Sequence, residues 1–381
     1  MKKIIKLTDN MKIERYNYGN TKIAFLHKNT FSFFFGEDEN IIPVAKSCNL
    51  DIHQFNMTYP EFLIHDADFN EHKRFTSQSY VHEIYEKIYN YVKDNEIKIV
   101  IIFWAGHFWS EEFVERLKKI SYVAGYFGDD TDEADVTSKP YVKYYDYAFT
   151  GSYLFTENIT VPQKYIEWGA PKAKFIPLGA KKTSYPERIS NLTDRDIDIT
   201  YVGTNKLTKF FFIARLKRYF GQRMRIYGKG WNGNNSILRT TLLEILKFWY
   251  RIPKIDAPSQ KNILKIYGRT KIGINMHQSW GPSNVRSYEL PLNGIMQITD
   301  NEKGYRKIYK IGKEIVTYKN HDHREAIKRI EYYLKHPKER MTIAMAGYRR
   351  AAKEYKLEDT FKQLIDEIRR QKRYKNLLKS L

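Results

Sequence analysis

Short apolar runs alternate along this chain with longer segments of helical periodicity. The clearest helical pattern covers 80–94, where Val81, Ile84, Ile88 and Val92 share one stripe. Strands separated by such crossover helices are typical of a parallel α/β sheet. In the first half of the chain, runs with the length and residue types of strands occupy 22–27, 50–55, 98–104, 122–128, 147–151 and 174–179.

The same alternation resumes after a polar stretch at 181–196, which predicts a linker. We therefore expect an N-terminal Rossmann-like domain at 1–185, a C-terminal one at 186–360, and a basic amphipathic helix at 361–381. Ligands of doubly wound sheets bind beyond the carboxyl ends of the strands, so the predicted active site is the cleft between the domains. The later strands are expected at 196–205, 224–231 and 271–276, and the helices at 206–219, 259–268 and 284–293.

The composition narrows the class of protein. The 381 residues are 42% hydrophobic and 15% aromatic, which is enough for two cores. The single cysteine, Cys48, excludes an internal disulfide and lies in an apolar run, which favours a buried structural thiol over a nucleophile. The N-terminus lacks the apolar region of a secretory signal, and the longest apolar run, 99–109, is about half the length of a membrane-spanning helix. We therefore expect a cytoplasmic protein.

The net charge of +21 is unevenly distributed along the chain. Residues 1–200 contain 25 Lys and Arg against 29 Asp and Glu, whereas residues 201–381 contain 40 against 15. Such asymmetry either attracts phosphates, anionic lipids or nucleic acid, or reflects a solvated lysine-rich surface.

An apolar, aromatic and basic segment at 237–255 has two interpretations. Leu242, Ile245, Leu246 and Trp249 share a helical face, and cations flank it. The helix either lies on an anionic membrane surface, which would make the protein peripheral, or packs on the second domain.

The densest chemistry lies in GPSNVRSYE at 281–289, between a predicted strand and a predicted helix. Ser283 is a candidate N-cap, and the first amides of the helix would then bind an anion such as a diphosphate. Gly281 allows close approach of a ligand, and Arg286 adds a planar donor. Glu289, one turn after Arg286, either accepts the hydroxyl protons of a ribose or forms a local salt bridge. The sequence contains no Walker phosphate loop, Cys/His metal cluster or nucleophile elbow.

The segment from about 270 to 355 resembles the C-terminal domain of the CgeB-like branch of the group-1 glycosyltransferases. The similarity lies in INMHQSWGPSNVRSYELPLNGIMQITDN, IGKEIVTYKN and EYYLKHPKERMTIAMAGYRRA. YVGTN at 201–205 is similar to the family's first strand and loop, YGKGW at 227–231 to its later glycine turn, and GYFGDDT and IPLGA extend the likeness to the N-terminal half. The resemblance implies a GT-B fold of two Rossmann-like domains with an interdomain cleft. In such a fold the helix at 361–381 would cross back to the first domain. It also implies a nucleotide-diphosphate sugar donor, for which UDP is the expected nucleotide.

The resemblance assigns residues to the donor site. Glu289 would hold the ribose, while Ser283, Asn284 and Arg286 would meet the diphosphate or the sugar. Enzymes of this fold need no metal ion and no cofactor, because cations and helix dipoles neutralise the leaving diphosphate. The remaining donor residues would come from the two glycine-containing loops: Gly203, Thr204 and Lys206 from one, and Gly228 and Lys229 from the other.

One position departs from the family pattern. Retaining members often have two glutamates eight positions apart, and Gly281 stands eight positions before Glu289. The stereochemistry is therefore open. An inverting reaction needs a base from the first domain, and the candidates after its predicted strands are His107, Asp129 and Asp130. Each has a structural alternative, packing for the histidine and helix capping for the aspartates.

Three functions fit this sequence. The first is a glycosyltransferase acting on a cell-surface glycan, a lipid-linked glycan or a protein. The second is a glycosyltransferase that modifies nucleic acid, such as DNA bases, which the basic half of the chain motivates. The third is a binding protein that keeps the GT-B fold without catalysis.

Overall fold

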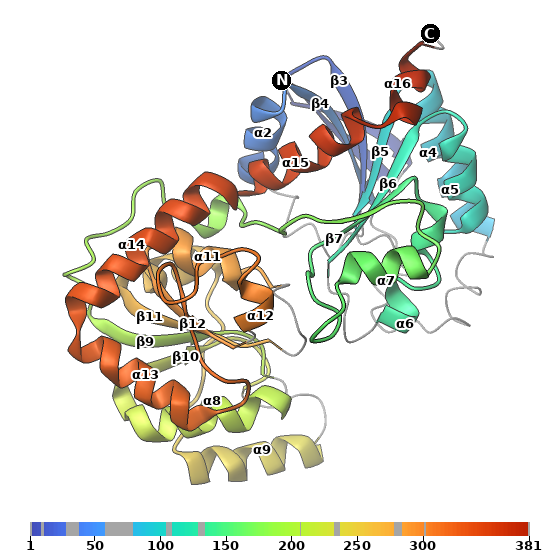
Figure 1. The fold of residues 1–381 in the computed structure, drawn as a ribbon. Helices are drawn as coiled ribbons and strands as arrows, with labels where there is room; N and C mark the ends of the chain where they lie inside the picture. Colours follow the sequence, from blue (N-terminus) through green and yellow to red (C-terminus); the bar gives the residue numbers. More distant parts are fainter. Residues whose placement is uncertain are drawn as a thin grey trace. The chain divides into compact units, whose positions relative to one another are not determined.

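Figure 1 shows the computed structural model of the chain. The chain forms two compact units, each of which makes most of its contacts within itself. Unit 1 comprises Met1–Lys181 and Leu357–Leu381, and unit 2 comprises Lys182–Lys356. Each unit has its own sheet and its own apolar core. The structure describes residues 2–8, 11–27, 38–57, 79–103, 109–128, 134–205, 207–231, 237–277, 284–300 and 302–379.

The sheet of unit 1 has eight strands in the order β1-β2-β4-β3-β5-β6-β7-β8. Strand β2 is antiparallel to β1 and β4, and the other neighbours are parallel. Strand β5 (IVIIF) is buried at every position, as expected for a parallel strand with both faces covered. The strands are β1 Lys2–Thr8, β2 Met11–Asn17, β3 Thr21–His27, β4 Leu50–Met57, β5 Ile99–Phe103, β6 Tyr122–Phe127, β7 Tyr147–Thr150 and β8 Ala173–Phe175.

Helix α4 of unit 1 buries the apolar stripe that the sequence predicted. On α4 (Ser79–Asp94), the predicted stripe of Val81, Ile84, Ile88 and Val92 is buried in the core, which confirms the sequence pattern. The other helical elements are α2 Asp38–Ser47, α5 Glu111–Lys118, α6 Ala134–Thr137, η3 Val142–Tyr144, α7 Val161–Glu167, α15 Leu357–Arg369 and α16 Lys372–Lys379.

The C-terminal segment packs within unit 1, far in sequence from the residues it contacts. The amide of Leu357 donates a hydrogen bond to the carbonyl of Ala180 at 2.9 Å. Phe361 is fully buried, and its ring centroid lies 5.4 Å from that of Phe25 on β3. Helices α15 and α16 therefore complete unit 1 rather than extend unit 2.

Unit 2 has a wholly parallel sheet in the order β10-β9-β11-β12-β13. Numbered from its first strand this is the doubly wound order 2-1-3-4-5, in which the chain reverses direction across the sheet after its second strand. The strands are β9 Ile197–Val202, β10 Met224–Tyr227, β11 Thr270–Asn275, β12 Met296–Thr299 and β13 Val316–Thr317. The helical elements are η4 Lys182–Ser184, α8 Leu207–Phe220, η5 Gly221–Arg223, α9 Ile237–Tyr250, α10 Gln260–Arg269, α11 Arg286–Leu292, α12 Glu302–Tyr305, α13 His323–Lys335 and α14 Pro337–Glu354.

The predicted strands of both halves are present, and the sequence pattern missed four further ones. Strands β1 and β2 (KKIIKLT and MKIERYN) mix charged with apolar residues, so no continuous apolar run marked this hairpin. Strands β12 and β13 are short. Cys48 is buried after the end of α2, and burial raises the pKa of its thiol, which confirms the predicted structural role.

Candidate functional site

The strand order of unit 2 places its switch point between β9 and β11. These parallel strands pair directly, and the connection after β9 runs to β10 on one side whereas the connection after β11 runs to β12 on the other. In doubly wound sheets the crevice beyond the carboxyl ends of two such strands is the usual ligand site. Two of the segments singled out in the sequence follow these strands, the loop that starts at Gly203 and the segment from Asn284 to Glu289.

Gly203 and Arg286 meet at this switch point, although 83 positions separate them in the sequence. A Cβ added to Gly203 would lie 3.0 Å from Nη1 of Arg286 and 2.8 Å from the hydroxyl of Tyr201. The guanidinium of Arg286 stands over the Tyr201 ring, 5.9 Å from its centroid, and its Nε donates to Oδ1 of Asn275 at 3.3 Å. A side chain at position 203 would have to displace one of these two groups, so the absence of a Cβ lets the cation lie beside this backbone.

The second glycine turn is joined to the first by hydrogen bonds. The amide of Gly203 donates to the carbonyl of Tyr227, and the amide of Asn205 donates to the carbonyl of Lys229, both at 2.9 Å. Gly228 has φ +137°, and a Cβ there would overlap the carbonyl of Gly203. The structure thus brings Gly228 and Lys229 beside the loop that contains Gly203 and Thr204.

The start of α11 differs from the sequence expectation. We expected Ser283 to cap this helix. The helix instead begins at Arg286, with Val285 in the N-cap position, and the apolar side chain of Val285 cannot accept a hydrogen bond. Oδ1 of Asn284 instead accepts from the amide of Ser287 at 3.2 Å. The carboxamide of Asn284 is held by that of Asn275 through two hydrogen bonds of 3.0 and 3.1 Å. Asn284 therefore fixes the helix start and orients Arg286.

A buried polar network supports this helix start, and the sequence reasoning did not identify it. Nδ1 of His277 lies 2.8 Å from Oδ1 of Asp300, and both side chains are only 1% exposed. Nε2 of His277 lies 3.3 Å from the hydroxyl of Tyr305, which lies 2.7 Å from Oγ of Ser287. The hydroxyl of Tyr305 also accepts from Nδ2 of Asn275 at 2.9 Å. The signal in the sequence was a polar residue just beyond each of two neighbouring strands, His277 after β11 and Asp300 after β12.

Glu289 is a buried carboxylate on α11, with 8% of its surface exposed. It lies close enough to Tyr267 on α10 to act on that phenol electrostatically. Burial raises the pKa of Tyr267, the charge of Glu289 raises it further, and that of Arg286 opposes the shift. Tyr267 and Tyr201 are both buried, and neither hydroxyl has a hydrogen-bond partner among the described residues. The carboxylate of Glu289 thus lies near the Tyr267 phenol, and the guanidinium of Arg286 near the Tyr201 ring.

Six of the sequence-predicted residues lie outside the described residues. Three belong to the donor-site prediction and three are the candidate bases. Their roles stay predictions. They are Lys206, Gly281 and Ser283, and His107, Asp129 and Asp130.

Comparison with known proteins agrees with this geometry. Residues 209–366 match the family model described as "Glycosyl transferase-like". Sucrose-phosphate synthase from Thermosynechococcus elongatus has a similar structure, with a TM-score of 0.66 at 11% identity over 95% of this chain and 100% of that chain. The fold is GT-B. The fold class expected from the sequence is thereby confirmed, and the matched residues form a glycosyltransferase-like region. The CgeB-like branch stays a prediction.

Two further structures of similar fold were solved with bound nucleotides or sugar nucleotides. HepE from Anabaena, solved in complex with UDP, is similar with a TM-score of 0.61 and 11% identity over 92% of this chain and 100% of that chain. An alpha-glucosyltransferase solved in complex with UDP-glucose and DNA containing an abasic site is also similar. Its TM-score is 0.54 at 13% identity, over 91% of this chain and 98% of that chain. No curated protein matches the sequence of this GT-B chain.

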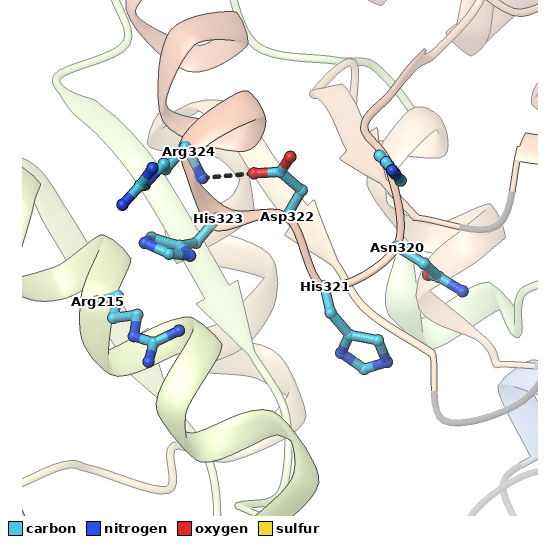
Figure 2. Close-up of a pocket in the computed structure, with 7 residues that line it drawn as sticks. Arg215, Asn320, His321, Asp322, His323 and Arg324 are labelled. Atoms are coloured by element: carbon cyan, nitrogen blue, oxygen red, sulfur yellow. Dashed lines mark hydrogen bonds between the residues drawn. The ribbon is translucent and has the colours of Figure 1, made fainter.

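One pocket of unit 2 lies away from the predicted donor residues. Figure 2 shows it between α8 and the start of α13, where Asp322 accepts hydrogen bonds from the amides of Arg324 and Glu325 at 3.0 Å. Burial lowers the pKa of His323, and the charges of Arg215 and Arg324 act in the same direction. Asp322 occupies the helix N-terminus that an anion would otherwise use. The lining residues are Arg215, Lys319, Asn320, His321, Asp322, His323 and Arg324.

Within the described ranges, no helix of this GT-B protein has both the length and the apolar character needed to cross a membrane. Nor do those residues contain a group of three or more His, Cys, Asp or Glu side chains placed to hold a metal ion.

Proposed function

We propose that this GT-B protein is a glycosyltransferase that moves a sugar from a UDP-linked donor to a cell-surface glycan, a lipid-linked glycan or a protein acceptor. The observation that carries the proposal is the position of the Arg286 guanidinium at the switch point of unit 2, where its Nη1 would lie 3.0 Å from a Cβ added to Gly203. A backbone without a Cβ beside a planar cation suits the approach of a diphosphate. The complex of HepE with UDP supports UDP as the nucleotide.

The proposed chemistry follows from charge. When the bond between the sugar and the diphosphate breaks, negative charge grows on the leaving phosphate oxygens, and Arg286 donates hydrogen bonds to them. Lys206 and Lys229 add positive charge from the two joined loops. Glu289 accepts the hydroxyl protons of the ribose, as a carboxylate does in other doubly wound nucleotide sites. Asn284 acts as a positioning residue, because its carboxamide is engaged with Asn275 and the amide of Ser287.

The acceptor side of the proposal concerns unit 1. An inverting reaction requires a base that takes the proton of the acceptor hydroxyl, and His107, Asp129 and Asp130 are the proposed candidates. No metal ion or cofactor takes part in the proposed reaction, since Arg286 and the lysines neutralise the leaving diphosphate. We also propose a cytoplasmic location, which suits a chain whose single cysteine is a buried thiol.

Product analysis tests the proposal. The full chain is incubated with UDP-glucose, UDP-galactose or UDP-N-acetylglucosamine, with and without glycan acceptors, and the products are separated by chromatography. We expect release of UDP together with a glycosylated acceptor or a free sugar. An isomerised sugar nucleotide as the only product would contradict transfer, and an unchanged donor in every reaction, despite measurable UDP binding, would favour a non-catalytic binding protein.

Site variants test the assignment. Glu289→Ala should abolish turnover, and Arg286→Lys should weaken UDP binding by about tenfold because lysine cannot form the paired hydrogen bonds of a guanidinium. The matched control is Arg218→Lys on the exposed side of α8, which should bind UDP like the wild type. Retained turnover in Glu289→Ala would overturn the proposed donor site.

A second candidate function is glycosyl transfer to nucleic acid. Two observations favour it, the 40 basic against 15 acidic residues after position 200 and the similarity of the fold to an alpha-glucosyltransferase solved with DNA. Contacts to phosphates would make DNA or RNA binding weaken steeply with salt. Binding that is undetectable at low salt, or insensitive to salt, would argue against this candidate.

A further inference from the structure

Helix α9 exposes three large apolar side chains to solvent. Phe248 is 83% exposed, Trp249 is 68% exposed and Ile245 is 51% exposed. In Figure 1, α9 lies at the lower edge of unit 2, next to α8. Phe248 and Trp249 are the most exposed large hydrophobic side chains of the described residues. Contiguous apolar surface of this kind usually marks a binding surface.

The opposite side of α9 is anchored, so its orientation is set by packing. The ring of Tyr250 packs edge-on against Phe210 of α8, with 6.1 Å between centroids. Leu246 is partly buried against the core of unit 2. Lys247 is 5% exposed and pairs with Glu244 at 2.9 Å. The helix therefore buries a lysine while its aromatic side chains face solvent, an arrangement opposite to that of an ordinary surface helix.

This arrangement corrects one sequence expectation. We expected Leu242, Ile245, Leu246 and Trp249 to act together as one apolar face. The structure separates three of them, because Leu246 turns toward the core whereas Ile245 and Trp249 remain exposed; the side chain of Leu242 lies outside the described ones. Phe248 completes the exposed set, which we call the α9 patch: Ile245, Phe248 and Trp249.

The charge around the α9 patch identifies its occupant. Residues 206–271 contain sixteen Lys and Arg and only two acidic residues, Glu244 and Asp256. Exposed Arg251 and Lys254 follow the helix directly. Aromatic side chains flanked by cations are the composition that binds the interface of an anionic membrane. A second copy of this chain would present the same positive charge and be repelled.

We propose that the α9 patch docks unit 2 on an anionic phospholipid surface. Phe248, Trp249 and Ile245 enter the boundary between headgroups and acyl chains, where a Trp ring is favoured, and Arg251 and Lys254 meet lipid phosphates. The inference is independent of the proposed transferase activity, because lipid binding is measured without a sugar donor.

Vesicle binding by the full chain tests the inference. Sedimentation with vesicles of 30% phosphatidylglycerol in phosphatidylcholine should retain the protein, and vesicles of phosphatidylcholine alone should retain at least about tenfold less. The double variant Phe248→Ser and Trp249→Ser should lower the partition coefficient on anionic vesicles by at least about tenfold. Equal sedimentation of the double variant and the wild type, or equal binding to both vesicle types, would overturn the proposal.

A matched pair of variants controls for nonspecific adsorption of exposed apolar side chains to vesicles. Ile245 on α9 is 51% exposed, and Ile166 on α7 of unit 1 is 50% exposed. Ile245→Ser should lower vesicle binding several-fold, whereas Ile166→Ser should leave it unchanged. Because both side chains are exposed, both variants should fold, which circular dichroism checks. Size-exclusion chromatography with light scattering adds a decisive alternative: self-association that the double variant abolishes, without vesicle binding by the wild type, would make the α9 patch a contact between copies and contradict lipid docking.

Discussion

The guanidinium of Arg286 lies 5.9 Å from the ring centroid of Tyr201, and an added Cβ on Gly203 would come within 3.0 Å of Nη1 of that arginine. Tyr201 near the end of β9, Gly203 in the loop after it and Arg286 at the start of α11 thus converge on the carboxyl edge of one parallel sheet. The arginine is held from behind, since Asn275 accepts from its Nε and Asn284 is engaged with Asn275. A cation fixed in this way loses little side-chain freedom when it binds an anion.

Gly203→Ala should weaken UDP binding by about tenfold, because the methyl group must displace the Tyr201 hydroxyl or the Arg286 guanidinium. Isothermal titration with UDP measures the effect. Gly268→Ala on α10 is the control, since a Cβ there meets only Oγ of Ser190 at 3.7 Å. That variant should bind UDP normally. Equal affinity of both variants and the wild type would show that UDP does not use this loop.

Asp300→Ala should lower the free energy of unfolding by about 3 kcal/mol, because it leaves buried His277 and its amide without their acceptor. Urea denaturation of the full chain measures this. Arg329→Gln breaks an exposed ion pair with Glu325 in the same unit and should change stability little. A double-mutant cycle with His277→Ala should show strong coupling between the two side chains. Additive effects would mean that the pair contributes no interaction energy of its own.

The stability of unit 1 should fall between about pH 6.5 and pH 4 because of His53. Burial lowers the pKa of this fully buried histidine and Arg15 acts in the same direction, so that the pKa is about 4 even though the charge of Asp51 opposes the shift. The folded state therefore binds fewer protons than the unfolded state in this range. The stabilisation is complete above the unfolded pKa and is lost as the pH falls toward the folded value, by up to about 3 kcal/mol.

Urea denaturation at pH 7, 5.5 and 4.5 measures that loss. His53→Gln keeps a partner for the hydroxyl of Tyr91, which lies 2.9 Å from Nδ1 of His53, and removes the titrating group. The variant should show a flatter pH dependence than the wild type. Carboxylates with lowered pKa values, such as those of Asp38 and Asp51, act at lower pH and do not produce this slope. Parallel curves for the two proteins would contradict the assignment to His53.

Chelation should leave the proposed transferase reaction unchanged. Arg286 and the two loop lysines supply the positive charge that a divalent cation supplies in other phosphate chemistry. The check is UDP release measured with and without EDTA at about 5 mM, a concentration in excess of trace metal ions. A loss of turnover in EDTA that Mg²⁺ or Mn²⁺ restores would show that a metal ion takes part.

Much of the fold was predictable because local patterns and packing agree. Two examples are the buried run IVIIF of β5 and the apolar stripe of α4, which consists of Val81, Ile84, Ile88 and Val92. Removing these apolar side chains from water stabilises the fold, and their spacing along the chain already shows which element buries them. The hairpin of β1 and β2 was not predictable in this way, since its strands mix charged with apolar residues and contain neither a long apolar run nor a regular alternation.

The candidate site was predictable in part. Gly203 and Arg286 were identified from motifs, but motifs give no distance, and the contact depends on β9 and β11 being neighbours in the sheet. The pair of His277 and Asp300 went unrecognised because isolated polar residues after strands have no local signature. The pairing appears only when β11 and β12 lie side by side.

The sequence by itself determined the two α/β halves, the glycine loops, the polar segment before α11 and the concentration of positive charge after position 200. These features depend on residue type and spacing along the chain. Tertiary structure alone decided that Oδ1 of Asn284 accepts the amide of Ser287 at the start of α11, and that Phe248 and Trp249 face solvent while Lys247 is buried. The physical reason is the same in each case: a side chain's partner is chosen by strands and helices distant in sequence, and periodicity does not record which face of a helix meets them.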